Sequence, residues 1–187
     1  NNIDFIATSL GENRNTNILP EQYTEMNICD PNQISTVLDL FKPTHVIHTA
    51  AITNVDYCEL NAEKCQQTNV FASSYIWDAC QERNIHFQFL STDFVFDGQA
   101  TAPYATTAMP APLGIYGESK WRGEQRVQSS GADHVIVRTS WVYAATGRNF
   151  VLTMLRLMRE RQVVRVVNDQ IGAPTMATGL AGICWSL

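Results

Sequence analysis

Apolar residues gather in short runs that alternate with longer amphipathic segments along this chain. The short runs, typical of buried strands, lie at residues 3–8, 45–51, 86–91, 135–139 and 163–167. The amphipathic segments, typical of helices, lie at residues 31–41, 61–83, 113–129, 149–161 and from 176 onward. Strands that alternate with helices favour a parallel sheet with helices on both faces. We therefore expect an α/β fold built on a doubly wound parallel sheet.

The helix expected at residues 31–41 has clear ends. Asp30 followed by Pro31 is typical of an N-cap and a first-turn proline. Lys42-Pro43 ends the helix, because proline cannot continue it. Polar segments expected as loops lie at residues 11–24, 97–112 and 169–174. No internal repeat or flexible linker interrupts the pattern, so we expect residues 1–187 to form a single domain.

The composition excludes several classes of protein. The 187 residues carry a net charge of −5 and no basic run, which argues against a nucleic-acid or anionic-membrane partner. The pI of about 5.3 agrees with this. No apolar stretch reaches the ~18 residues of a membrane span, and the first residues lack the regions of a signal peptide. They also lack an initiator methionine, so we expect the true amino terminus to lie upstream.

Cysteines and histidines do not predict a metal site. The cysteines are odd in number and form no CxxC pair, so we expect free, mostly buried thiols in a reducing cytoplasm. His45 and His48 differ by an odd number on an expected strand, so they point to opposite faces. His86 and His134 have no neighbouring set of ligands. We expect no metal in this chain.

Tyr116 and Lys120 carry the clearest chemistry in the sequence. Their spacing of four places both side chains on one face of an expected helix. Thr92 follows the strand at 86–91, and parallel sheets bind ligands beyond the carboxyl ends of their strands. Together these residues supply a proton donor, a positive charge and a hydrogen-bond donor for a carbonyl oxygen. This set indicates carbonyl reduction, which needs a hydride source.

Each of these features also has an ordinary structural explanation. A tyrosine and a lysine at this spacing arise by chance in about one chain in three, and by default they lie on a helix surface. Ser91-Thr92-Asp93 can simply end a strand and cap the next turn. Their coincidence at one edge of a sheet favours the chemical interpretation. An ammonium ~5 Å away, at a dielectric of ~20, stabilises a phenolate by ~3 kcal/mol, so we expect Lys120 to lower the pKa of Tyr116 by ~2.

The same residues lie within a longer resemblance. The chain is similar to the extended short-chain dehydrogenase/reductase superfamily and, within it, to the dTDP-4-dehydrorhamnose reductase family. The matching stretches, in family order, are Val46–Asp56, Asn69-Val70, Leu90–Gly98, Pro110–Lys120, Arg138–Tyr143, Asn149-Phe150 and Asn168–Thr175. The Tyr/Lys and Ser-Thr-Asp motifs point to the superfamily. Arg138-Thr-Ser-Trp-Val-Tyr143 and Asn168-Asp-Gln170 point to the reductase branch, and the implied fold is Rossmann-like.

The resemblance implies a role for each site residue. The implied catalytic set is Thr92, Tyr116 and Lys120, the last two of which would also contact the cofactor. The other implied cofactor contacts are Asp30, near the adenine, and Thr49, Ala50, Ala51 and Thr53. The residues implied to face the sugar are Asp93, Phe94 and Trp141. The implied reaction reduces the 4-keto group of dTDP-4-dehydro-L-rhamnose to dTDP-L-rhamnose with NADPH or NADH, in the cytoplasm, and a homodimer is the association we consider.

Several alternatives stay open. Asp30 could serve only as a helix cap, and Trp141 could be a core tryptophan at a strand-to-loop turn. Arg14 would suit the 2′-phosphate of NADPH and Glu12 the ribose diol of NADH, so cofactor preference is open. One alternative function is a non-catalytic regulatory subunit on the same fold, resembling that of methionine adenosyltransferase. Another is a nucleotide-sugar epimerase or dehydratase, in which Asp93 would add acid–base chemistry.

The resemblance is incomplete at both ends of the chain. The family begins with a strand and a glycine-rich turn whose helix amino terminus holds the pyrophosphate. This sequence starts at what resembles the second strand, and it stops before the smaller C-terminal part that closes over the nucleotide-sugar. We therefore expect a fragment of a longer reductase that lacks the first βα unit and the C-terminal substrate part, with doubtful activity by itself.

Overall fold

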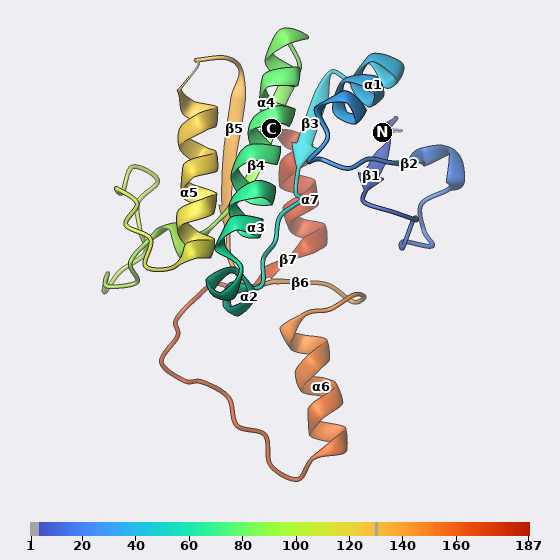
Figure 1. The fold of residues 1–187 in the computed structure, drawn as a ribbon. Helices are drawn as coiled ribbons and strands as arrows, with labels where there is room; N and C mark the ends of the chain where they lie inside the picture. The colour runs from blue at the N-terminus through green and yellow to red at the C-terminus, as the bar shows by residue number, and fades with distance from the viewer. Residues whose placement is uncertain (1–3, 130) are drawn as a thin grey trace. The chain divides into compact units, whose positions relative to one another are not determined.

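The computed structural model of the protein describes residues 4–129 and 131–187. Contacts between Cα atoms divide the chain into two compact units, Asn1–Ile136 and Val137–Leu187. The first unit holds most of the strands and helices (Figure 1). The expectation of a single domain over residues 1–187 stays a prediction.

The first unit is built from short strands joined by helices. Its strands are β1 (Ala7–Ser9), β2 (Tyr23–Glu25), β3 (His45–His48), β4 (His86–Thr92) and β5 (His134–Thr139), which ends in the second unit. Its α-helices are α1 (Pro31–Phe41), α2 (Val55–Leu60), α3 (Ala62–Gln66), α4 (Ser73–Glu82) and α5 (Ile115–Gln128). Two 3₁₀ turns, η1 (Pro20–Gln22) and η3 (Asp93–Val95), and one π-helical turn, η2 (Gln67–Ala72), complete it.

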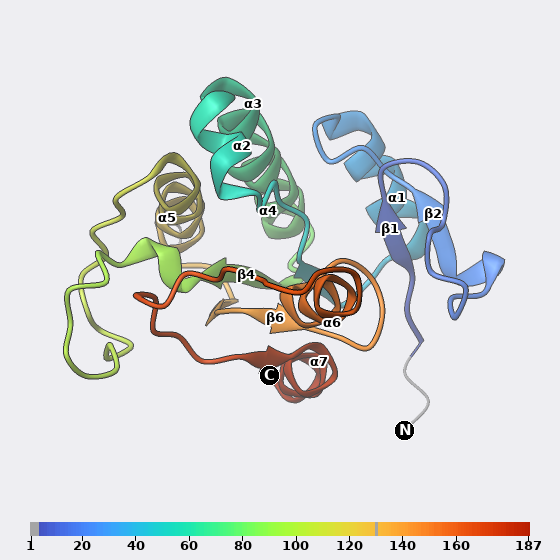
Figure 2. The ribbon, with the colours of Figure 1, turned by 90° about the horizontal axis from the view of Figure 1, so that it is seen from below.

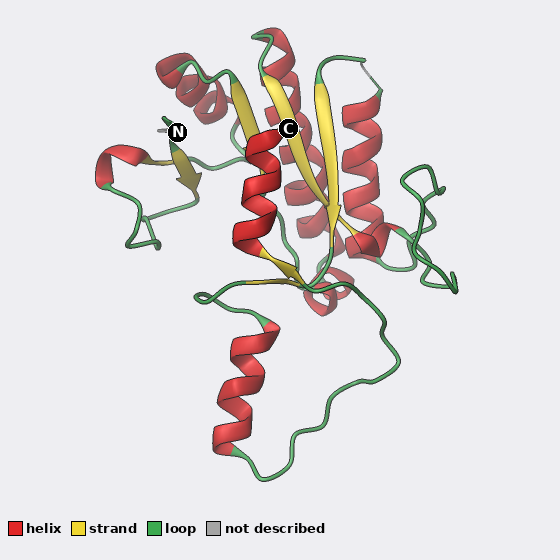
Figure 3. Ribbon diagram, turned by 180° about the vertical axis from the view of Figure 1, so that it is seen from behind, coloured by secondary structure: helices red, strands yellow, loops and turns green. Residues whose placement is uncertain are grey.

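The strands of this unit form two sheets. β1 pairs with β2 in parallel, with Thr8 opposite Thr24. The other sheet has the order β3-β4-β5, and its strands β3 and β4 are also parallel (Figure 3). Parallel strands need crossover connections, and the helices between β3 and β4 supply one, whereas β1 and β2 are joined by a loop with the turn η1. The expected α/β class is confirmed.

Helix α1 begins and ends where the sequence predicts. The Oδ1 atom of Asp30 accepts hydrogen bonds from the Asn32 and Gln33 amides at 3.0 and 3.4 Å. Lys42 ends the helix in a left-handed conformation with φ of 47°. The apolar face of the helix joins the main core. That core comprises Met26, Ile34, Leu38, Ile76, Trp77, Ala79, Cys80, Ile85, Phe87, Phe89 and Val127.

Residues 62–82 form one continuous helical run, with α2 beside its start (Figure 2). The predicted helix at 61–83 is therefore confirmed in its extent. The pattern did not predict α2 or the π-helical turn η2. A π-helical turn carries one extra residue per turn and often occurs at functional sites. This turn buries Asn69 completely.

Two of the predicted elements, one loop and one strand, are wrong. The polar segment at 11–24 was expected to be a loop, but its end belongs to β2, which pairs with β1. The strand expected at 163–167 is not found in the described part of the chain, and Val163 and Val167 are 73% and 68% exposed there. An apolar run becomes a strand only where another strand offers backbone partners, and periodicity along one segment does not reveal that partner.

The second unit contains two short strands and two helices. They are β6 (Val142–Tyr143), α6 (Phe150–Glu160), β7 (Thr175–Met176) and α7 (Ala177–Ser186). β6 pairs with β7 in parallel, and Ser140 Oγ donates to the Ala173 carbonyl at 2.8 Å. Both helices were predicted, whereas two-residue strands are too short to leave a pattern. Among the described residues, every helix is too short or too polar to cross a bilayer.

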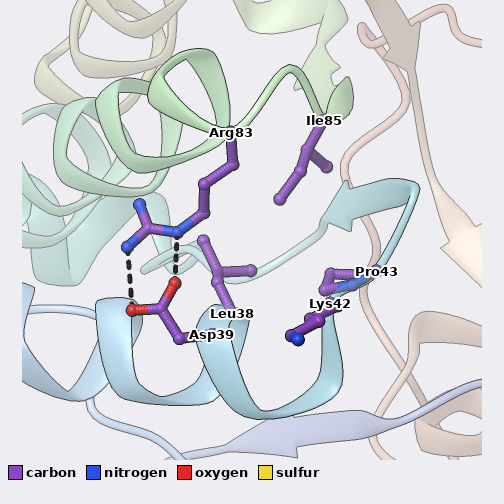
Figure 4. Close-up of a pocket in the computed structure, with 6 residues that line it drawn as sticks. All are labelled: Leu38, Asp39, Lys42, Pro43, Arg83 and Ile85. Atoms are coloured by element: carbon purple, nitrogen blue, oxygen red, sulfur yellow. Dashed lines mark hydrogen bonds and ion pairs between the residues drawn. The ribbon is translucent and has the colours of Figure 1, made fainter.

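A surface hollow lies between α1 and α4, close to the amino-terminal ends of β3 and β4 (Figure 4). Its lining residues are Leu38, Asp39, Lys42, Pro43, Arg83 and Ile85. The Arg83 guanidinium donates to both carboxylate oxygens of Asp39, at 2.8 and 3.2 Å. Parallel sheets bind ligands at the opposite edge, beyond the carboxyl ends of their strands. We therefore interpret this hollow as a junction of two helices and not as the functional site.

Candidate active site

Thr92 is the last residue of β4 and the N-cap of the 3₁₀ turn η3. Its Oγ1 atom accepts a hydrogen bond from the Phe94 amide at 3.2 Å and donates to Asp93 Oδ1 at 3.2 Å. The residue is only 5% exposed. Strand β4 therefore delivers a fixed hydroxyl to the carboxyl edge of the sheet, as the sequence predicts.

Tyr116 lies in the first turn of α5, whose start is fixed by its neighbours. Glu59 Oε1 accepts a hydrogen bond from the Ile115 amide at 2.7 Å, which satisfies one of the free donors at the helix start. The Tyr116 ring is buried and meets the Phe94 ring edge to face, with centroids 5.6 Å apart. The phenol thus faces η3, where Thr92 and Asp93 lie.

The electrostatics of Tyr116 differ from the expectation. Burial is the largest cause that raises its pKa, and the charge of Asp93 acts in the same direction. The hydrogen bond with the Thr92 hydroxyl opposes this rise. The expected lowering of this pKa by Lys120 is therefore wrong for this structure, because burial and the neighbouring acidic groups raise it. A raised pKa keeps the phenol protonated at neutral pH, so its proton is present for transfer to a substrate oxygen.

Lys120 lies one turn further along α5 and is 3% exposed. Its Nζ atom sits over the Phe89 ring, 4.0 Å from the centroid. Burial lowers the pKa of this ammonium to about 8, while the charges of Glu124 and Cys65 oppose that change. Lys120 is therefore still mainly charged at neutral pH. The helix brings Tyr116 and Lys120 together on a buried face, as their spacing predicts.

A small apolar cluster lies against Tyr116. It contains Cys58 and Cys65, whose sulfur atoms are 2.8 Å apart. Burial raises the pKa of Cys58 to about 12, with a further contribution from its hydrogen bond to Cys65. All five cysteines are free, and four of them are buried. Among the described residues, no group of three or more His, Cys, Asp or Glu side chains could hold a metal ion.

The proposed cofactor contacts follow two strands. Thr49, Ala50, Ala51 and Thr53 form the loop after β3, and all are exposed except Ala51, which is partly exposed. Small, accessible side chains at a strand end leave room for a nucleotide. Asp30 lies downstream of β2 and caps α1, so its structural role is established while its contact with adenine stays a prediction.

Asp93 and Phe94, expected to face the sugar, both lie in η3 beside Thr92. Burial is the largest cause that raises the pKa of Asp93, and its hydrogen bonds oppose the rise. Phe94 is 41% exposed, so part of its ring is free to contact a ligand. Trp141 belongs to the second unit, is 45% exposed and has a positive φ of 45°. Its high exposure does not support the alternative of a core tryptophan, and its substrate contact stays a prediction.

Asn69 is a site residue whose function the sequence reasoning missed. Its side-chain amide donates to the Ile52 carbonyl and to Ser119 Oγ, both at 3.0 Å, while its Oδ1 accepts from the Ile52 amide at 2.8 Å. Asn69 therefore ties the loop after β3 to helix α5. The only signal for it was its presence in a matching stretch, because the π-helical turn that buries it has no sequence signature.

The comparisons with known proteins decide the family. The model of the RmlD substrate binding domain matches residues 6–187. The chain belongs to the RmlD substrate binding domain family. Its relatives include the dTDP-4-dehydrorhamnose reductase of Aggregatibacter actinomycetemcomitans, which is 36% identical over 95% of this chain and 60% of the relative. The enzyme of the same name from Escherichia coli K12 is 41% identical over 81% of this chain and 51% of the relative.

Solved structures agree with this membership in the RmlD family. The dTDP-4-dehydrorhamnose reductase of Bacillus anthracis, in complex with NADP, superposes with a TM-score of 0.83 at 36% identity. The match covers 90% of this chain and 62% of that structure. The expected Rossmann-like fold is confirmed. The chain spans between about half and three fifths of the length of these RmlD-family relatives.

Proposed function

We propose that this chain carries the catalytic centre of a dTDP-4-dehydrorhamnose reductase. The observation that carries the proposal is the set of Thr92, Tyr116 and Lys120, buried at the carboxyl edge of β4 and along one face of α5. The relatives that bear this name support the choice of substrate. The substrate is then a dTDP-linked 4-keto-6-deoxyhexose, and the product is dTDP-L-rhamnose.

Each of the three residues has a separate role in the reduction. NADPH or NADH, when bound, supplies the hydride that reaches the C4 carbonyl carbon of the sugar. Tyr116 donates its phenolic proton to the oxygen, which would otherwise become an alkoxide. Thr92 donates a hydrogen bond to the same oxygen. The positive charge of Lys120 offsets the negative charge that Tyr116 acquires when it gives up its proton.

The surroundings of these residues fit a cofactor and a sugar. The loop of small residues after β3 offers accessible space for the nicotinamide nucleotide, and the Bacillus anthracis relative was solved with NADP. Phe94 offers an exposed ring, and Asp93 a partly buried carboxyl, to the sugar. We further propose that the protein acts in the cytoplasm, where reduced nicotinamide nucleotides are available, and without a nucleic-acid or membrane partner. A homodimer is part of the same proposal.

The proposal is tested by following reduced-nicotinamide absorbance while the full-length gene product acts on dTDP-4-dehydrorhamnose. We expect consumption of NADPH or NADH, and a loss of about 10²–10⁴-fold in kcat for Tyr116→Phe, because the proton donor is removed. Tyr75→Phe is the matched control, since Tyr75 packs against the main core and away from the cluster around Tyr116. It should retain full activity.

Other outcomes would contradict a reductase. No consumption by a correctly folded full-length protein that binds a partner would favour the regulatory-subunit alternative. Conversion of the sugar without net consumption of reduced nicotinamide would favour an epimerase or dehydratase. Equal activity in Tyr116→Phe and Tyr75→Phe would remove Tyr116 from the chemistry.

A further inference from the structure

Phe89 lies against the Lys120 side chain inside the first unit. The Lys120 Nζ atom is 4.0 Å from the centroid of the Phe89 ring. Phe89 is fully buried and Lys120 nearly so, which leaves little water to solvate the ammonium. The face of an aromatic ring attracts a cation, and the attraction grows when the pair is desolvated. The ring therefore restores part of the stabilisation that burial removes from the charge.

The position of the Phe89 ring is fixed by its neighbours. A Cβ atom at Gly123 would lie 2.8 Å from Phe89 Cζ, so a glycine is needed for the ring to reach this face of α5. The His48 ring lies on β3 with its centroid 5.8 Å from that of Phe89. The Phe87 ring, two residues earlier on β4, is 6.4 Å away. The close approach at Gly123 and the contact with His48 hold the ring where the ammonium meets it.

Three titratable groups interact electrostatically with the Lys120 ammonium: Glu124 of the same helix α5, Cys65 of α3 and His48 of β3. Tyr116, one turn earlier on α5, interacts in turn with Asp93 of η3 and Cys58 of α2. Burial keeps His48 neutral, so it adds no positive charge beside the ammonium. The Phe89 ring face is a close contact of the Lys120 ammonium, and the Glu124 charge acts on the ammonium from the same helix.

We infer that Phe89 is a positioning residue for Lys120, because its ring face holds the ammonium in the buried site one helical turn from Tyr116. The consequence of this contact for catalysis rests on the proposed function. In that function, a charged Lys120 ammonium that is held in place offsets the negative charge left on Tyr116 after proton transfer. The contact itself needs neither cofactor nor substrate, so it can be tested without either.

The given sequence has three lysines, Lys42, Lys64 and Lys120. In the full-length gene product labelled with carbon-13 lysine, the signals of Lys120 are assigned by their loss in Lys120→Arg, and a pH titration by NMR yields its pKa. In Phe89→Leu, we expect the pKa of Lys120 to fall by about one below its starting value of about 8. The titrations of Lys42 and Lys64 should be unchanged.

Two further variants separate the cation contact from general packing. Phe89→Tyr keeps an aromatic face and should preserve the Lys120 titration. Phe87→Leu makes the same change at an equally buried position of the same strand, without the ammonium contact, and should also preserve it. Lys120 pKa values that are equal in Phe89→Leu and Phe87→Leu would overturn the inference.

If Phe89→Leu fails to fold, the contact can still be tested with a phenylalanine analogue that keeps the ring. Trifluorinated phenylalanine at position 89 retains the ring but withdraws electron density from its face. We expect the Lys120 pKa to fall with this residue, and an unchanged value would overturn the inference. The titration uses no reductase assay, so failure of the proposed function and failure of this inference are distinguishable.

Discussion

Burial determines the protonation state of His48, which lies at the end of β3. It is 4% exposed, and its Nε2 atom shares a 2.9 Å hydrogen bond with Ser73 Oγ. Burial, the larger cause, and the charge of Lys120 lower its pKa to about 3, from 6.5. Between these two values the unfolded chain binds a proton that the folded chain does not. The contribution of His48 to stability is therefore complete above pH 6.5 and is lost as the pH falls toward 3.

This difference predicts how acid affects the protein. His48→Gln keeps a hydrogen-bonding group for Ser73 but does not titrate. Between about pH 6 and 4, the free energy of unfolding should fall less steeply in this variant, by up to about 1.4 kcal/mol per pH unit. Urea unfolding at a series of pH values measures the slope. His45→Gln, on the exposed end of the same strand, should keep the original slope, and an equal slope in His48→Gln would refute the account.

Single residues also show how far the sequence predicts the site. Tyr116 and Lys120 were predicted because their spacing needs only a helix, and Thr92 because it follows a strand. The pKa of Tyr116 was not predicted, because desolvation depends on neighbours that are distant in sequence. The contact of Phe89 with Lys120 was missed for the same reason: its residues are 31 positions apart and meet only in the folded unit.

At the scale of elements, the start of α5 and the turn η3 form one rigid junction. Gly117, in the first turn of α5, faces the backbone of Phe94, where a Cβ atom would clash with the carbonyl oxygen. A Cβ atom there would also lie 3.1 Å from Pro112 Cβ. This close approach places Tyr116 against Thr92. A larger residue at position 117 must separate the two elements.

Gly117→Ala should therefore destabilise the protein and disturb the site. We expect the free energy of unfolding to fall by about 1–3 kcal/mol, the usual cost of overpacking. The same change at Gly179, a position in α7 with no atom within 4 Å of an added Cβ, should raise it by about 0.5–1 kcal/mol, since alanine favours helix. Urea unfolding followed by circular dichroism compares the two. A stabilising effect in both would show that the junction is not tight.

The elements also differ in how well the sequence predicts them. Both ends of helix α1 were predicted, because Asp30, Pro31 and Lys42-Pro43 are local signals of where it begins and ends. The turn η2 and the short strands β2, β6 and β7 were missed, since their formation depends on partners elsewhere in the chain. The run at 163–167 was wrongly predicted as a strand because its apolar pattern has no strand to pair with in the described part of the chain. Local signals thus predicted the longer helices, whereas the short helix α2 and the short strands were missed.

At the scale of the whole molecule, the chain corresponds to about half to three fifths of the length of its relatives. The first unit contains the proposed catalytic residues Thr92, Tyr116 and Lys120 and the proposed cofactor loop, while Trp141 lies in the second unit. The aligned region spans 51% to 62% of the relatives and of the solved structure described above. Because the relatives are longer than this chain, the test of the proposed reduction uses the full-length gene product.

The central claim is that this site transfers hydride to a sugar carbonyl and protonates the oxygen. The most direct measurement supplies NADPH deuterated at the transferable position of the nicotinamide and locates the label in the sugar product by NMR and mass spectrometry. The account predicts one deuterium at C4 of dTDP-rhamnose, formed by the full-length protein with Tyr116 and formed about 10²–10⁴-fold more slowly by Tyr116→Phe. Oxidation of the nicotinamide without deuterium at C4, or an unchanged sugar, would contradict it.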